Sequence, residues 1–259
     1  MKLKIKLSLV LLTCVAFTYT ACKKSGSAPT NTVTAKTVSS QVALNLAQTL
    51  YSGFGVFNIN DGLNAPGTLG LNHHKGIKLN DINSDPACGL AVDTTLNYST
   101  SIGDTAQASV SGNIKFVFTC TGQTFTGFNV IDNLNVSEST SQLAVSYVLG
   151  ENLVLTSLNP SDPNSQYSFN GSLNESANLQ YKTGSKQKEN ESYNYTFKSL
   201  VIDPTNGIVS GSATFSTTGS TPSGNWNYSG TAVFLGNNMV KITINGTAYT
   251  VNIQTGQVS

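Results

Sequence analysis

The stretch "VKITINGTAYTVNI", residues 240–253, decides the fold class of this 259-residue chain. Apolar and polar residues alternate on both sides of Asn245-Gly246, which is the pattern of two strands that each bury one face. Asn-Gly tolerates the positive φ angles of a type I′ turn, so the stretch predicts a tight antiparallel hairpin. Its alternating apolar residues are Val240, Ile242, Ile244, Tyr249, Val251 and Ile253.

The same two-residue period extends back to about residue 91. It is clear in "NIKFVFTC" (113–120), "SYNYTFKSL" (192–200) and "NWNYSGTAVFLG" (225–236). About eleven strand candidates lie between residues 90 and 254, and their short connections favour antiparallel neighbours. Helices do not alternate with these strands, so the pattern argues against a parallel α/β sheet.

Glycine recurs inside these strands, in a small-Gly-x-apolar-x-aromatic pattern at 111–116, 210–215 and 229–234. Glycine weakens a regular strand, so its repeated use indicates bulges or sharp bends. Bends of this kind curl a long antiparallel sheet. We therefore expect a mainly β domain made of one curled sheet, as a barrel or half-barrel, with a two-sheet β-sandwich as the alternative.

One helix is predicted ahead of the sheet, in "TVSSQVALNLAQTLYSGFG" (37–55). A stripe of apolar residues recurs every four positions, and Thr37 or Ser39 is suited to cap the start and Gly53 to end it. We expect this helix to pack on the sheet or at a barrel mouth. The stripe consists of Val38, Val42, Leu46 and Leu50.

The first 21 residues have the layout of a secretory signal: three lysines, an apolar run that is too short to span a bilayer, and Ala21 before Cys22. With "ACKK" following, this segment resembles the lipobox of bacterial lipoproteins, in particular those of the Bacteroidota. The resemblance implies that Cys22 carries lipid and anchors the chain. A plain signal peptide, a retained anchor and cleavage at Cys14 are the alternatives.

The resemblance also implies a location. Lys23-Lys24-Ser25 lacks the acidic residues that mark surface export in the Bacteroidota, so we expect an outer-membrane anchor facing the periplasm. Residues 22–36 are rich in Ser, Thr and Pro and read as a flexible tether. The expected organisation is therefore a signal at 1–21, a lipid-anchored tether at 22–36 and a folded domain at 37–259.

The amino-acid composition limits the classes of molecule that the protein is expected to bind. Charged residues make up 10% of the chain and arginine is absent. Without the three signal lysines, 11 Lys face 13 Asp and Glu, so the formal charge of the rest is −2. Nucleic-acid binding is not expected, because it uses clustered Lys and Arg on phosphates.

Cys88 and Cys120 are the cysteines left after Cys14 and Cys22 are assigned to the signal and the lipid. In an oxidising compartment they predict a disulfide that closes a loop of roughly 33 residues and stabilises by about 3–4 kcal/mol. Two buried thiols are the alternative. No CxxC pair is present, and the adjacent His73-His74 are read as a solvated loop, so no metal or other cofactor is expected.

These features predict a non-catalytic binder or carrier of an apolar or amphipathic ligand, with aromatic side chains on the inner face of the sheet. The alternative is a structural or interaction module that shows exposed aromatics, such as Trp226 and Tyr228, to an envelope partner. Thr94 and Thr105 stand in Asp-Thr-x triplets that resemble the O-glycosylation signal of Bacteroidota. The candidate ligand-lining residues are Phe116, Phe118, Tyr195, Phe197, Phe215 and Phe234.

Overall fold

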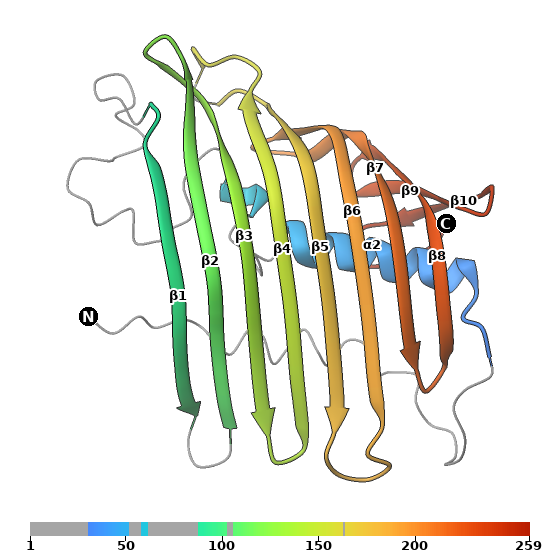
Figure 1. The fold of residues 1–259 in the computed structure, drawn as a ribbon. Coiled ribbons are helices and arrows are strands. Elements are labelled where there is room, and N and C mark those ends of the chain that lie inside the picture. The colour runs from blue at the N-terminus through green and yellow to red at the C-terminus, as the bar shows by residue number, and fades with distance from the viewer. Residues whose placement is uncertain (1–30, 52–57, 62–87, 103–105, 163) are drawn as a thin grey trace.

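A long antiparallel sheet and one helix make up the described part of the protein (Figure 1). The computed structural model describes residues 31–51, 58–61, 88–102, 106–162 and 164–259. A short 3-10 helix, η2 (Ile59–Asp61), follows the helix α2 (Ala35–Tyr51). The strands are β1 (Ala91–Ile102), β2 (Ala106–Thr121), β3 (Thr124–Thr140), β4 (Leu143–Ser157), β5 (Tyr167–Tyr181), β6 (Lys188–Asp203), β7 (Gly207–Thr221), β8 (Gly224–Gly236), β9 (Met239–Ile244) and β10 (Thr247–Asn252).

Each strand of the sheet pairs with its neighbours in the chain. The order runs from β1 to β10 without a crossover, and the pairs are antiparallel. β1 and β10 stand at the two ends of this order, so the sheet is not closed. The predicted mainly β, antiparallel fold with one helix before the sheet is confirmed, with ten strands in the described residues.

Helix α2 begins two residues earlier than predicted, because Thr34 caps it. The backbone N–H of Thr37 donates to Thr34 Oγ1 at 3.2 Å, so neither Thr37 nor Ser39 is the cap. The predicted apolar stripe is confirmed: its four residues, Val38 to Leu50, are buried at the centre of the core. No helix in the described residues has the length and apolar content to cross a bilayer.

The residues just before α2 are held by the sheet. Thr32 forms a parallel bridge to Asn225 of β8, and the N–H of Val33 donates to the carbonyl of Asn225 at 2.9 Å. Residues 31–36 were expected to belong to the tether, and here 31–33 lie along β8 while 35 and 36 are already helical. The orientation of α2 is thereby fixed at its first turn.

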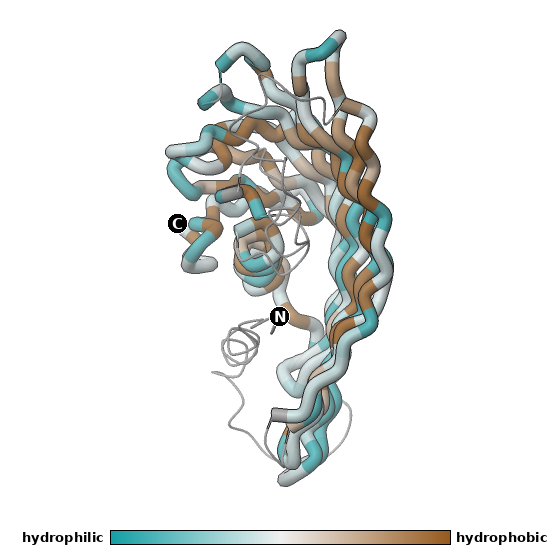
Figure 2. Tube along the Cα trace, turned by 90° about the vertical axis from the view of Figure 1, so that its left-hand side faces the viewer, coloured by the Kyte–Doolittle hydropathy of each residue, from teal (hydrophilic) through white to brown (hydrophobic). Residues whose placement is uncertain are grey.

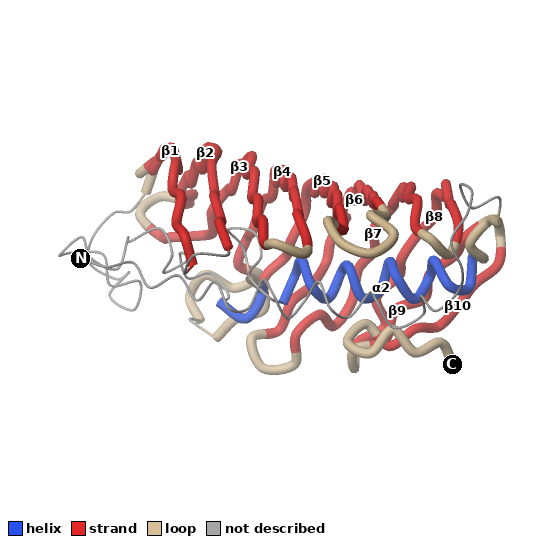
Figure 3. The backbone as a smooth tube through the Cα atoms, turned by 90° about the horizontal axis from the view of Figure 1, so that it is seen from below, coloured by secondary structure: helices blue, strands red, loops and turns tan. Residues whose placement is uncertain are grey.

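The sheet curves around α2. In the view of Figure 3, β1–β6 lie on one side of α2, and β9 and β10 lie on the other. Bends in the strands make this possible, and the register shifts between Phe169 and Gly171 and again between Lys198 and Val201. At Gly211, where φ is +115°, a Cβ would lie 2.5 Å from the carbonyl oxygen of Ser199, so glycine is needed there.

The C-terminal hairpin, β9 and β10, packs against the helix α2. Asn245 and Gly246 both have positive φ, at 50° and 79°, as the predicted type I′ turn requires. Val240, Ile242 and Ile244 on β9 are fully buried, and both β9 and β10 contact α2. The hairpin predicted from the sequence is confirmed.

The disulfide between Cys88 and Cys120 is confirmed as well. It joins the segment before β1 to the end of β2, beside the backbone bond from the N–H of Gly89 to the carbonyl of Phe118. Among the described strands β1 pairs only with β2, so this covalent link fixes one end of the edge.

Candidate functional site

The six aromatic residues expected to line a ligand site lie together on the inner face, the face of the sheet that meets α2. Each is buried, with at most 5% of its surface exposed, and all six belong to the main core cluster. Their rings contact one another: the centroids of Tyr195 and Phe197 are 5.8 Å apart, and those of Tyr195 and Phe215 are 6.4 Å apart. These rings are core packing in this structure, and whether they also touch a ligand stays a prediction.

Trp226 and Tyr228 are not the exposed aromatics that the sequence suggested. Trp226 is buried with 4% of its surface exposed, and its indole N–H donates to Thr217 Oγ1 at 3.0 Å. Tyr228 is half-buried, and its hydroxyl donates to the carbonyl of Val33 at 2.9 Å. Both point inward because they occupy the alternate positions of β8 that face the core.

The unexpected feature of the inner face is its acidity. The chain has five glutamates, and every one of them points inward, in phase with the apolar residues of its strand. The lysines of β2, β6 and β9 alternate with the inward residues, so Lys115, Lys188, Lys198 and Lys241 are exposed on the other face. The inward carboxylates are Asp132 and Glu138 on β3, Glu151 on β4, Glu175 on β5, and Glu189 and Glu191 on β6.

Glu175 holds the helix to the sheet. Asn45 Nδ2 donates to its Oε1 at 2.9 Å, and Thr49 Oγ1 donates to its Oε2 at 3.0 Å. The hydroxyl of Tyr147 also bonds to this carboxyl, and Tyr195 donates to Asn45 Oδ1 at 2.8 Å. The side chains that face Glu175 from α2, β4 and β6 thus form one buried polar network.

Burial dominates the protonation of Glu175. The pKa of Glu175 is raised to about 7, chiefly because burial removes the carboxyl from solvent. Hydrogen bonds from Thr49, Asn45 and Tyr147 lower the pKa, and the charge of Glu191 raises it. The same hydroxyl of Thr49 is also within 2.8 Å of the carbonyl of Asn45. A protonated Glu175 can donate from Oε2 to Thr49 while Thr49 donates to that carbonyl, so the neutral acid satisfies every partner.

Two further carboxyls adjoin this network on β6. The hydroxyl of Tyr193 donates to Glu191 Oε2 at 3.0 Å. Burial raises the pKa of Glu191, and the charge of Glu189 adds to the rise. Burial alone raises the pKa of Glu189. Burial therefore makes both carboxyls hold their protons more tightly than free glutamates do.

Asp132 and Glu151 form a directly opposed pair on β3 and β4. The backbone N–H of Glu151 donates to Asp132 Oδ1 at 3.0 Å, and both side chains are buried, at 5% and 3% exposed. The carboxylate of Asp132 therefore caps a backbone donor of the neighbouring strand.

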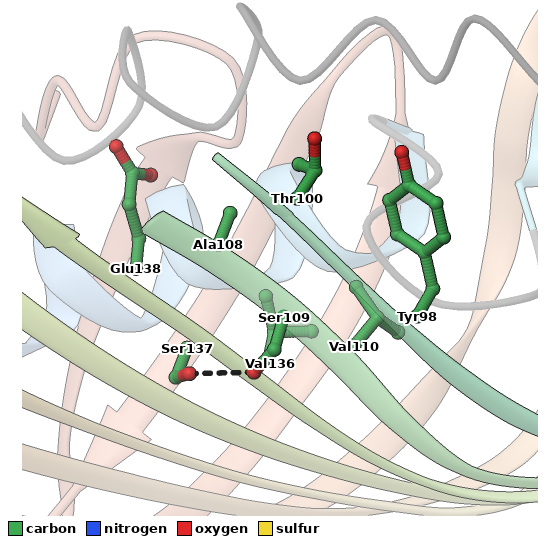
Figure 4. A pocket seen from close by; sticks show the side chains of 8 residues that line it. All are labelled: Tyr98, Thr100, Ala108, Ser109, Val110, Val136, Ser137 and Glu138. Atoms are coloured by element: carbon green, nitrogen blue, oxygen red, sulfur yellow. Dashed lines mark hydrogen bonds between the residues drawn. The ribbon is translucent and has the colours of Figure 1, made fainter. Parts of the chain in front are cut away.

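Glu138 stands apart from these groups, near the end of the sheet where β3 turns into β4, which is the lower end in Figure 1. It is 8% exposed, burial raises its pKa, and its Oε1 has no hydrogen-bond partner. Figure 4 shows its side chain on the same side of the strands as Thr100 and Tyr98, whereas Ser109 and Ser137 bond to each other on the opposite side.

The inner face is thus divided along the strands. Figure 2 shows hydrophobic segments gathered where the sheet passes the helix and paler or hydrophilic residues at the lower end. The aromatic cluster around Phe116 and Phe169 occupies the first part, and Glu138, Glu189 and Glu191 occupy the second. The inner face is therefore apolar and aromatic where it meets α2 and carboxylate-rich beyond it.

The sequence contained the signal for this acidic face, and sequence reasoning missed it. In "LNESA" and "ENESYNYTF" the glutamates occupy the same alternate positions as the buried apolar residues, Leu173 on β5 and Tyr193 on β6. A glutamate at the same alternate positions of a strand as the buried apolar residues predicts a buried carboxyl.

The remaining predicted sites divide between described and undescribed residues. Cys22, Thr105 and His73-His74 lie outside the described residues. Thr94 is half-buried in β1, opposite Ile114 of β2, on the same face as the partly buried Val92 and Leu96. Within the described ranges, His, Cys, Asp and Glu nowhere gather in a group that could hold a metal ion.

Comparison of the chain with known protein families, with curated proteins and with solved structures finds no match in any of the three.

Proposed function

We propose that the chain is a lipid-anchored protein of the bacterial envelope that binds or carries an amphipathic ligand and performs no catalysis. The observation that carries this proposal is the division of the inner face into an aromatic part and a carboxylate-rich part. The open sheet supports it, because its strands do not close and the lower end of the inner face extends past α2 (Figures 1 and 2).

In this proposal the lipid at Cys22 anchors the protein to the membrane, and the inner face of the curled sheet binds the ligand. One acyl chain alone binds a membrane only reversibly, whereas two or three chains anchor it stably. The expected position is the periplasmic side of the outer membrane. A ligand would lie along the inner face, with its apolar part toward the aromatic cluster and its polar part toward the glutamates.

The test is extraction of the full chain, purified from the envelope of a Gram-negative host, followed by mass spectrometry of the extract. Ala177→Trp places an indole on the inner face between Tyr147 and Glu191, its partners on β4 and β6. Asn178→Trp places the same group on the exposed face one residue away. We expect an amphipathic compound with wild type and Asn178→Trp and its loss with Ala177→Trp.

A clean extract from folded wild-type protein would remove the carrier proposal. Equal amounts of the compound from both tryptophan variants would place it somewhere other than the inner face. Circular dichroism of each variant establishes that the sheet is intact.

The second candidate function, an interaction module, is favoured by one observation. β1 is a 12-residue edge strand whose only strand partner in the described residues is β2. Such an edge can pair with a strand of another protein. Cross-linking at an exposed residue of β1, Asn97, in intact cells would identify an envelope partner if this candidate is correct.

A further inference from the structure

The buried carboxyl of Glu138 lacks a partner where one is needed. Its Oε1 makes no hydrogen bond, although the side chain is more than nine-tenths buried. It lies on β3 between Ala108 of β2 and Val145 of β4, neither of which offers a side-chain donor. Burial of an ionised carboxylate is unfavourable unless a donor or a cation compensates it.

The space beside Glu138 is small and largely apolar. It has a volume of about 10 Å³, which is room for one water-sized group. Figure 4 shows Tyr98, Thr100, Ala108 and Glu138 around it, and Val110 and Val136 complete its walls. A neighbouring open depression of about 350 Å³ lies on the opposite face of the sheet, because most of its lining residues alternate with the inward ones: Ser99, Ser101, Gln107, Ser109, Ser137 and Ser139. The body of a ligand bound at Glu138 would therefore extend along the inner face.

Among the described strands, the charged side chains on the inner face are all acidic. The other inward carboxylates lie on the same face of the sheet, and the described lysines of β2, β6 and β9 lie on the opposite face. Lys182 lies near the same end of β3 as Glu138, but its ammonium group donates to Ser139 Oγ at 2.6 Å and to the carbonyl of Thr140 at 2.7 Å. A positively charged group is therefore attracted to Glu138, and none of the lysines on the described strands competes with it on this face.

We propose that Glu138 binds the ammonium group of a primary amine, as the polar end of the amphipathic ligand. This inference rests on the proposed binding function and specifies its ligand class. An ammonium group matches the volume and donates to a carboxylate. A divalent metal ion prefers several carboxylate or carbonyl ligands, and the residues that line this space supply a single carboxyl.

The test measures binding of octylamine, octanol and octanoate to the full chain in phospholipid nanodiscs, by calorimetry at pH 7.5 with empty nanodiscs subtracted. The three probes share an alkyl chain and differ in charge. We expect octylamine to bind at least about tenfold more tightly than octanol, since one charge-assisted hydrogen bond is worth about that factor, and octanoate to bind most weakly.

Glu138→Gln keeps the shape of the side chain and removes its charge. It should lower octylamine affinity by about tenfold, to that of octanol, and leave octanol affinity unchanged. Asp93→Asn is the matched control, because it removes one negative charge from the exposed face of the nearby β1 and should change neither affinity.

The outcomes separate the two proposals. If octylamine and octanol bind equally, or if Glu138→Gln leaves octylamine binding intact, the ammonium site is refuted, while the binding function stands. If no probe binds the folded chain and its extract carries no ligand, the binding function fails and the inference fails with it.

Discussion

Replacing Glu175 by glutamine should make the protein more stable at neutral and alkaline pH. The folded pKa of Glu175 is about 7, against an ordinary value of 4.5. Between these two values the folded state holds a proton that the unfolded state has released, so the free energy of unfolding falls as pH rises through this window. At about 1.36 kcal/mol per pH unit, the loss is about 3 kcal/mol once pH exceeds 7.

Glutamine reproduces the neutral acid. Its Oε1 accepts from Asn45 Nδ2, and its Nε2 donates to Thr49 Oγ1, which is the arrangement that the protonated carboxyl adopts. Glu175→Gln should therefore match wild type near pH 4.5 and exceed it by up to about 3 kcal/mol at pH 8. Its stability should vary less with pH over this interval.

The assay is guanidinium denaturation of the full chain, followed by the fluorescence of Trp226, the single tryptophan, which is buried beside Thr217. The reasoning is refuted if wild type becomes more stable between pH 5 and 8, or if Glu175→Gln is the less stable protein at pH 8. Asp203→Asn is the control of opposite sign, because hydrogen bonds, first that from Gln166, lower the pKa of this exposed carboxyl. Removing it should weaken the protein at neutral pH and leave it unchanged in acid.

Three other predictions concern the backbone, the disulfide and the anchor. Gly211→Ala should destabilise the fold by at least about 2 kcal/mol, measured by the same denaturation, because its Cβ would lie 2.5 Å from Ser199 O at a φ of +115°; a loss below half of that would show that the bend tolerates a side chain. Reduction of Cys88–Cys120 should cost about 3–4 kcal/mol and speed hydrogen exchange in β1 before other strands; uniform exchange across the sheet would contradict this. Cys22→Ala should abolish palmitate labelling in a bacterial host, and labelling equal to that of wild type would end the lipoprotein interpretation.

The strands could be predicted because each one carries its own period. The alternation in 113–120 and 192–200 fixes which side chains face the core, and the structure buries Phe116, Tyr195 and Phe197 accordingly. Asn245-Gly246 specifies its turn locally, and the apolar stripe of α2 specifies its buried face. Local chemistry is sufficient for these elements.

The candidate site could not be predicted in the same way, because its members meet only through the curvature of the sheet. Asn45 and Glu175 are 130 positions apart in the chain and meet at 2.9 Å. Glu138 and Tyr98 share a space because β1, β2 and β3 align in a register that no single strand specifies. The cap of α2 at Thr34 was missed for a simpler reason, since Thr34, Thr37 and Ser39 are all suitable capping residues.

The contact of α2 with β9 and β10 has a consequence for how the chain assembles. The hairpins of the sheet form between segments that are neighbours in the polypeptide, so they can form one after another from β1 to β10. The helix α2 precedes all of these hairpins in the chain, yet it packs against the last two strands, β9 and β10. Docking of α2 is therefore the step that completes the core. Until the C-terminal hairpin has folded, the apolar stripe from Val38 to Leu50 stays partly exposed to solvent.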